Sequence, residues 1–396
     1  MTRNAVAVLC LIAAVVGGAA TLGIAKAAGW LGGSKTIVQQ HFSAAGTAAP
    51  VVAAKPLTGN GFSPAEIYRS RAGGVVTIIS YFESPSAPDA SSGQGSGFVV
   101  SPQGSILTDA HVVTTAGEGQ LGSAQVAHTV YVQFSDGDRV PGSVVGYDLY
   151  DDVAVVHVDP ALHALDPLPL GDSARVVVGE PVAAIGSPFD YTNSLTVGVV
   201  SAIRRSISSL TTRYNLVDAI QTDAPINHGN SGGPLLDARG LAIGINAQIR
   251  SSGTDSGFEG VGFAVPIDSA KRSMAQILST GRVRYAYLGI KAEDLTASVA
   301  KKLGYAAKQG ALVDSVASGS PAAKAGLKAG THYLLFDGLQ IRVGGDAIVA
   351  IDGVPIRNAA DVVRVVSERL APGDVARFTL VRGATRRVVS VTLAAR

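Results

Sequence analysis

Apolar and polar positions divide the chain into four stretches, the first of which is one unbroken apolar run. It extends from Ala5 to Ala25, contains Thr21 as its only clearly polar residue, and follows Arg3. A helix of this length can cross a hydrocarbon core of roughly 30 Å, and a short basic flank favours the inner side. We therefore interpret residues 1–31 as a signal-anchor, or transmembrane, segment that holds the rest of the chain outside a bacterial cell membrane. Ala25-Lys26-Ala27 also fits a cleavage site, so secretion after signal cleavage is the alternative.

The second stretch, residues 32–62, has no sustained hydrophobic period. It is rich in Gly, Ala, Ser, Thr and Pro, a composition that is typical of flexible linkers. A helix is predicted to follow, with Ser63 as its cap, Pro64 in its first turn and Glu66 closing a capping box.

The third stretch, residues 63–281, alternates short apolar runs with turn residues. β-branched residues dominate these runs, and many short strands at this spacing predict a mainly β barrel or sandwich. The expected strands include Val75–Tyr81, Ser96–Val100, Val130–Phe134, Val153–Val158, Leu195–Ile203, Leu241–Ile249 and Val261–Pro266. Asp268 is predicted to cap a helix over Ser269–Ser279 that ends before Gly281.

The fourth stretch, residues 287–396, predicts a small mixed α/β domain. Its expected strands are Gly310–Val316, Asp346–Ile351, Ala376–Arg382 and Arg387–Leu393. A helix over Ala359–Leu370 is indicated by a stripe of Val362, Val363, Val366 and Leu370, with Asn358 as its cap.

Composition narrows the classes of protein. A chain of 396 residues suggests two or three domains, and 47% apolar with 16% charged residues predicts mostly globular structure. The formal net charge of +2 lacks the basic excess of a nucleic-acid-binding protein. The one cysteine, Cys10, excludes an intrachain disulfide and a zinc site built on cysteines.

The strongest chemical signal is Gly229-Asn230-Ser231-Gly232-Gly233-Pro234. A serine nucleophile needs a tight turn that presents backbone amides to the substrate carbonyl, and glycines permit that turn. The loop Gly229, Asn230 and Ser231 is therefore a candidate oxyanion hole, with the amides of Gly229 and Ser231 as donors. An ordinary glycine-rich hairpin turn is the alternative.

Two further motifs supply a base and a carboxylate. His111 follows a short apolar strand in Leu107–Val113, and Tyr150–Val156 places Asp151 and Asp152 at the head of another strand. A carboxylate in such a place can fix the tautomer of a catalytic histidine. Spacing alone does not separate Asp151 from Asp152. Together, the order His, Asp, Ser within one β-rich region favours a nucleophilic hydrolase.

Residues 64–280 resemble the HtrA/Deg-type branch of trypsin-like serine proteases. The matching stretches are collinear through the region: Gly95–Val100, Thr108–Val113, Asp152–Val155, Ala184–Phe189, Thr196–Ser201, Gln221–Asn227 and Gly262–Pro266. The resemblance implies a chymotrypsin-like double β-barrel with the catalytic triad His111, Asp152 and Ser231 between the barrels. It also implies no metal and no organic cofactor.

The resemblance gives further residues a role. Asn230 stands where digestive proteases carry an aspartate that pairs with a freed N-terminus, so activation by such cleavage is not expected. Ile226 falls at a substrate-pocket position, which implies a small aliphatic residue before the scissile bond. His228 and Asp109 depart from the family pattern, because relatives usually have Pro, Phe or Arg at the first position and Asn at the second.

Residues 287–396 resemble a PDZ domain. Tyr287, Leu288, Gly289 and Ile290 match the loop whose backbone amides bind the terminal carboxylate of a peptide. An insertion occupies 331–344, and its contacts are not readable from the sequence. A small packing domain without a ligand is the alternative for this segment.

The resemblance implies a serine endopeptidase that cleaves unfolded or misfolded exported proteins in a quality-control role. Its expected partners are unfolded polypeptides, C-terminal peptides at the PDZ groove, the membrane, and two further copies in a homotrimer, but no nucleic acid. Two alternatives are a PDZ-based chaperone or scaffold with little protease activity, and a protease that processes one membrane protein.

Overall fold

The computed structural model describes residues 61–83, 92–118, 124–187, 193–209, 211–212, 215–227, 229–247, 260–336 and 338–395. All of these belong to one compact unit. None of the helices within these ranges is long and apolar enough to span a membrane. The predicted anchor and nearly all of the predicted linker lie outside the described residues.

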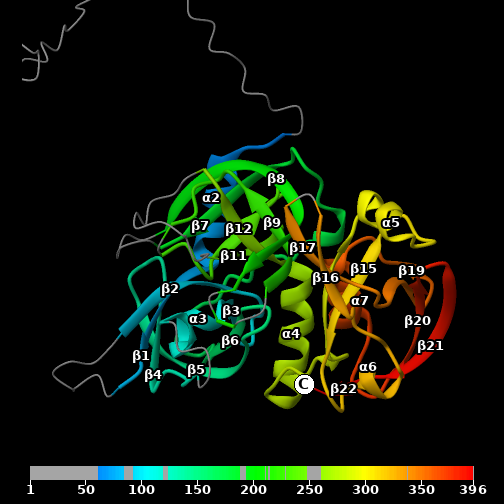
Figure 1. Ribbon diagram of the computed structural model, residues 1–396. Coiled ribbons are helices and arrows are strands. Elements are labelled where there is room, and N and C mark those ends of the chain that lie inside the picture. Colours follow the sequence, from blue (N-terminus) through cyan, green and yellow to red (C-terminus); the bar gives the residue numbers. More distant parts are fainter. Residues whose placement is uncertain are drawn as a thin grey trace, which may run out of the picture. The chain divides into compact units, whose positions relative to one another are not determined.

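Two closed six-stranded antiparallel barrels form the first part of the described chain (Figure 1). The first barrel pairs, in spatial order, β1 (Val75–Tyr81), β2 (Ser92–Val99), β3 (Ser105–Thr108), β6 (Val153–Val158), β5 (Arg139–Asp148) and β4 (Thr129–Gln133). The second pairs β10 (Pro234–Leu236), β11 (Ala242–Ala247), β12 (Gly262–Pro266), β9 (Asn215–Thr222), β8 (Ser194–Ser208) and β7 (Pro181–Gly186). The mainly β prediction and the double barrel are therefore confirmed.

Strands such as β6 are apolar throughout because both of their faces are buried. Ala154 and Val156 pack in a cluster made only of first-barrel residues, whereas Val153 and Val155 pack with residues of both barrels and of helix α4 (Ile267–Thr280). Successive side chains of a strand point to opposite faces. A strand that is buried on both faces therefore requires a continuous apolar run.

Short helices connect and flank the barrels. They are α2 (Pro64–Arg71), α3 (Ala110–Val113), α4 and the 3-10 turns η1 (Ala72–Gly74), η2 (Thr115–Glu118) and η3 (Ser173–Arg175). Helix α2 begins at Pro64 as predicted, but the expected capping box is wrong. The Ser63 side chain makes no capping bond, and its carbonyl accepts from the amides of Glu66 and Ile67 at 3.1 and 3.0 Å.

Helix α4 begins earlier than the sequence indicated. Its N-cap is Pro266, the last residue of β12, so Asp268 lies inside the first turn and does not cap the helix. Its carboxylate accepts instead from the hydroxyl of Ser173 at 2.9 Å. The predicted end is confirmed, since Gly281 adopts a left-handed φ of 74°.

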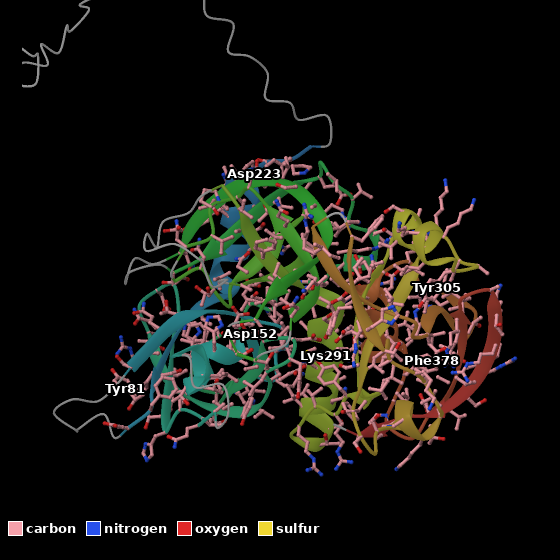
Figure 2. All side chains as sticks on the ribbon, in the orientation of Figure 1. Tyr81, Asp152, Asp223, Lys291, Tyr305 and Phe378 are labelled. Carbon is pink, nitrogen blue, oxygen red and sulfur yellow. The ribbon has the colours of Figure 1, made fainter. Side chains whose placement is uncertain are left out.

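The C-terminal part is a sheet packed against helices. The sheet order is β14 (Ile290–Leu295), β15 (Gly310–Val316), β18 (Ala347–Ile351), β20 (Val375–Arg382) and β21 (Thr385–Thr392), and β19 (Val354–Pro355) pairs with β18. A second small pairing joins β13 (Ala286–Tyr287) to β22 (Ala394–Ala395), and the helices are α5 (Ala297–Leu303), α6 (Pro321–Lys324) and α7 (Ala359–Arg369). Phe378, labelled in Figure 2, is fully buried in its core.

Helix α7 differs from its predicted buried stripe at one position. Asn358 caps it as expected, accepting from the amide of Asp361 at 2.8 Å. Val362 and Val366 are buried, but the third buried valine is Val365. Val363 is 49% exposed, because the helix turns this side chain away from the core cluster.

The insertion at 331–344 is a β-hairpin. Strand β16 (His332–Phe336) pairs with β17 (Leu339–Val343). Ile341 and Val343 are buried in a cluster with residues of α5, β14 and β15. The insertion is therefore packed on the C-terminal domain through β17, whereas Tyr333 and Leu335 of β16 are exposed.

Candidate active site

His111 and Asp152 form the centre of the candidate site. The Nδ1 atom of His111 lies 2.8 Å from Oδ2 of Asp152, and the backbone amide of His111 donates to Oδ1 at 2.9 Å. One carboxylate thus holds both the backbone and the ring of the histidine. With Nδ1 as the donor, the Nε2 atom carries the lone pair that a general base needs. Asp152 is labelled in Figure 2.

The turn before β6 decides which of the two adjacent aspartates meets His111. Asp152 adopts a left-handed φ of 53°, a conformation that Asp tolerates better than most residues. The amide of Tyr150 donates to Oδ1 of Asp148 at 2.9 Å, which fixes the turn from its other end. Asp151 lies instead 4.0 Å from Arg272, where burial and the charge of Asp148 raise its pKa to about 7.

Ser231 lies on a turn that requires glycine. Gly232 has a φ of 86°, and a Cβ at this position would lie 2.1 Å from the carbonyl oxygen of Ser96. A Cβ at Gly233 would lie 2.2 Å from the carbonyl oxygen of Ile185. The sequence reading of a tight glycine turn around the serine is therefore borne out by the local backbone.

Ser96, on β2 of the first barrel, holds this turn to the first barrel. Its amide donates to the Ser231 carbonyl at 2.7 Å, and its hydroxyl donates to the Gly229 carbonyl. The carbonyl of Ser96 accepts from the hydroxyl of Thr108 at 2.6 Å. The first-barrel strand thus joins the turn to the segment that precedes His111. Ser96 belongs to the matching stretch Gly95–Val100, but nothing in that stretch indicates its contact with the serine turn.

Asn246, on β11, holds the same turn within the second barrel. Its carbonyl accepts from the amide of Gly232 at 2.9 Å, and its amide donates to Gly233 at 2.8 Å. Its side chain donates to Pro234 at 3.1 Å. The sequence analysis missed this residue, because nothing in an apolar strand marks one asparagine as a partner of a distant turn.

The amides of the candidate oxyanion hole are available. Neither Gly229 nor Ser231 donates its backbone N–H to another residue of the described ranges. Asn230 is buried and donates through Nδ2 to the Pro225 carbonyl at 3.2 Å. Two free amides beside a serine can stabilise a developing oxyanion.

The hydroxyl of Ser231 is buried and has no hydrogen-bond partner among the described residues. The structure therefore brings His111 and Asp152 into contact but does not make the bond from Ser231 to the imidazole. The segment after His111 is nevertheless close to the serine loop. A Cβ at Gly95 would lie 2.5 Å from a methyl group of Val112 and 3.2 Å from the Ser231 carbonyl. Bonds between nucleophile and base are often long before substrate binds.

A second carboxylate, that of Asp109, borders the histidine. Its Oδ2 lies 3.8 Å from Nδ1 of His111, and its side chain is fully buried. Within the described residues, Asp109, His111 and Asp152 are the one group of such side chains whose ligand atoms all lie within 4.8 Å. Since Nδ1 already bonds to Asp152, we interpret the group as a proton-handling cluster and not as a metal centre.

The pKa of His111 reflects this surrounding. Burial lowers it, but the charge of Asp152, the hydrogen bond to Asp152 and the charge of Asp109 raise it to about 9. A raised pKa means that the imidazolium is stabilised. Activity that needs the neutral imidazole should therefore increase as the pH rises.

Three other described histidines have ordinary structural surroundings. His163 stacks on Phe134 with ring centroids 3.7 Å apart and bonds to Asp136 at 3.1 Å. His128 bonds to the neighbouring Thr129, and His157 is exposed on β6. His228 lies outside the described residues. Ile226, the predicted pocket residue, is half-buried and packs against the core of the second barrel.

The loop Tyr287–Ile290 has the geometry of an anion-binding turn. Gly289 has a φ of 83°, and a Cβ there would lie 2.3 Å from Cβ of Ser320. The amides of Leu288 and Gly289 donate to no residue of the described ranges. Loop residues and α7 residues line one cavity, among them Leu288, Gly289, Ile290, Val362, Val363 and Val366. The exposed Val363 is one of these lining residues.

The fold and the site together define a trypsin-like peptidase followed by a PDZ domain. Residues 95–245 match the trypsin-like peptidase domain family, and residues 286–393 match the PDZ domain family.

Individual relatives narrow this class. The chain is 40% identical over 303 residues to Protease Do-like 1, chloroplastic, of Arabidopsis thaliana, covering 76% of this chain and 63% of the relative. It is 37% identical over 299 residues to a probable periplasmic serine endoprotease, DegP-like, of Halomonas elongata, covering 76% and 56%. A solved structure of the HtrA-type protease AlgW with a tripeptide matches with a TM-score of 0.68 and 30% identity, covering 84% of this chain and 97% of that one.

The chain belongs to the HtrA-type family of serine proteases. It spans less than two thirds of the length of the two curated relatives described above.

Proposed function

We propose that this protein is a serine endopeptidase that cleaves unfolded or misfolded exported polypeptides. Ser231 attacks the peptide carbonyl, and His111 accepts its proton and later donates it to the leaving amine. Asp152 orients His111, and the amides of Gly229 and Ser231 stabilise the oxyanion. Water then hydrolyses the acyl-enzyme, so no metal or cofactor takes part.

The observation that supports this proposal best is the two-point hold of Asp152 on His111. Bonds of 2.8 and 2.9 Å to the ring and to the backbone fix the tautomer that a base needs. A histidine with a purely structural role does not require a buried carboxylate that bonds to both its ring and its backbone amide. The apolar side chain of Ile226 supports the proposal that the enzyme prefers substrates with a small aliphatic residue before the scissile bond.

An active-site probe tests the chemistry directly. We expect a fluorophosphonate to label the full chain at Ser231, because only a serine activated by a base and an oxyanion hole reacts readily. Peptide mapping by mass spectrometry identifies the modified residue. Labelling elsewhere, or no labelling in the presence of unfolded casein and PDZ-binding peptide, would contradict the proposal.

A second candidate function is a PDZ-based chaperone or scaffold with its protease switched off. The Ser231 hydroxyl bonds to none of the described residues, and this favours the alternative. The same labelling experiment separates the two, since a scaffold with an unassembled site stays unlabelled under every condition. A protease that processes one membrane protein would be labelled but would not cleave casein.

We propose further that the C-terminal domain binds the free carboxyl end of a peptide. Strand β14 is at the edge of its sheet, so a peptide can add there as a further strand. The amides of Leu288 and Gly289 are available for the terminal carboxylate. The valines of α7 in the groove favour an apolar last side chain.

Peptide binding should depend on both the carboxylate and the glycine loop. We expect a decapeptide with an apolar last residue to bind the full chain at least about tenfold more tightly than its C-terminal amide, since charge-assisted bonds are lost. Gly289→Ala should weaken binding of the acid form, because its Cβ meets Ser320. Gly326→Ala is the matched control, with a similar φ of 76° and open space. Affinity is measured by calorimetry. Equal affinity for the peptide acid and the peptide amide would refute binding through the terminal carboxylate.

The extracytoplasmic location belongs to the same proposal. The apolar run at residues 5–25 and the basic flank support an anchor, and a DegP-like relative is described as periplasmic. The mass of the chain isolated from membranes distinguishes a retained anchor from a cleaved signal. The homotrimer stays a prediction from the family resemblance.

A further inference from the structure

Asp109 occupies an unusual position for a carboxylate. It connects β3 to α3 and precedes His111 by two residues, but its side chain does not cap the helix. The side chain is fully buried, and neither carboxyl oxygen has a hydrogen-bond partner among the described residues. An aspartate that neither caps the helix nor bonds to any described residue has no evident structural task.

The charged groups that face Asp109 in the described structure are His111 and Asp152. Nδ1 of His111 lies 3.8 Å from Asp109 but 2.8 Å from Asp152, so the imidazole is already engaged by the other carboxylate. The backbone amide of Gly232 is also close, but it donates to the Asn246 carbonyl at 2.9 Å. If both aspartates were ionised, two negative charges would share one imidazole in a desolvated site.

We propose that Asp109 is a positioning residue that holds a proton as a neutral carboxylic acid throughout catalysis. This inference rests on the proposed function of His111 as the base. A second negative charge next to the ring would stabilise the imidazolium, which cannot accept a proton from Ser231. A neutral Asp109 leaves Asp152 as the one anion at Nδ1 and keeps the base available.

The electrostatics of the cluster agree with this placement of the proton. Burial raises the pKa of Asp109 well above its usual value, the charge of Asp152 raises it further, and His111 and the Gly232 amide oppose the shift. An ionised Asp109 adds to the charge and the hydrogen bond of Asp152 in raising the pKa of His111. A neutral Asp109 leaves Asp152 as the one carboxylate that stabilises the imidazolium.

A vibrational difference spectrum detects the proton directly. We expect the infrared spectrum of the full chain at pH 7 to contain a carboxylic-acid C=O band that is lost in Asp109→Asn and in Asp109→Ala. Asp136→Asn is the matched control. Hydrogen bonds lower the pKa of this exposed residue, so its replacement should remove only ionised carboxylate intensity. If the Asp109 variants also lose only ionised carboxylate intensity, the proposal is wrong.

The pH dependence of kcat/KM for fluorescent casein gives an independent test. Asn has the shape of the neutral acid, so the acidic limb of Asp109→Asn should stay within about 0.3 pH unit, or twofold, of the wild-type limb. If Asp109 is ionised in the working enzyme, removing its charge destabilises the imidazolium, and the limb moves to lower pH by about one unit or more. That shift would overturn the proposal. The infrared result does not depend on turnover, so an inactive protein with a protonated Asp109 would refute the proposed function alone.

Discussion

Replacement of Ser231 by alanine should lower the kcat for cleavage of unfolded casein by about 10^6-fold, the order seen when a triad nucleophile is removed. The substitution deletes one hydroxyl, and without it no acyl-enzyme forms. Residual hydrolysis would come from the oxyanion amides and substrate binding alone. Cleavage is measured as release of fluorescent fragments from labelled casein.

The fold should survive this substitution. The Ser231 hydroxyl makes no hydrogen bond to any described residue, whereas the turn itself is held by Ser96 and Asn246. Loss of an unpartnered buried polar atom costs little, so the free energy of unfolding should change by less than about 0.5 kcal/mol. The exposed Ser70→Ala is the matched control and should retain activity. Full activity in Ser231→Ala would remove the basis of the enzymatic assignment.

Asp152→Asn should lower kcat by about 10^4-fold, because the amide keeps the shape of the carboxylate but offers an N–H toward the ring. The imidazole then has to accept at Nδ1, which places its proton on Nε2, the atom that should receive the proton of Ser231. The rate of covalent labelling by a fluorophosphonate should fall in parallel. The measurement is steady-state hydrolysis of casein at fixed pH.

Asp151→Asn is the control for Asp152→Asn. It changes the same atoms one residue away, but Asp151 lies beside Arg272 and does not bond to His111. We expect hydrolysis to remain within a few-fold of the wild-type rate. If Asp151→Asn, and not Asp152→Asn, were the inactive variant, the role of orienting His111 would have to be assigned to Asp151.

Local signals predicted the elements well where burial and backbone sterics act on neighbouring residues. Strand β6 has the predicted bounds, and helix α7 starts where Asn358 was expected to cap it. Predictions of helix caps failed at two places, because the helix start there is set by neighbouring backbone and not by the predicted side chain. Ser63 does not close its capping box, and Pro266 displaces Asp268 from the start of α4.

The candidate site was likewise predictable where it depends on neighbouring residues and not where it depends on distant ones. The glycines around Ser231 predict a tight turn, and the structure has no room for a Cβ at Gly232 or Gly233. Ser96 and Asn246 gave no such signal, since a hydrogen bond from a strand to a distant turn leaves no periodicity in the chain. Helical spacing predicts Val363 on the buried stripe of α7, but its exposure in the cavity beside Leu288 and Gly289 depends on how α7 meets the sheet.

The order of residues by itself determined the two-domain plan, the strand-rich barrels and the three kinds of side chain needed for nucleophilic hydrolysis. Hydrophobic alternation, turn sterics and chemical reactivity are properties of short segments and need no partner. Local spacing left Asp151 and Asp152 as alternatives and the family resemblance indicated Asp152. Only the tertiary structure brings Asp152, and not Asp151, into contact with His111, and encloses Asp109 beside them without a hydrogen-bond partner among the described residues. Those outcomes depend on the left-handed turn before β6 and on the packing of the serine loop against the first barrel, which bring together groups that lie far apart in the sequence.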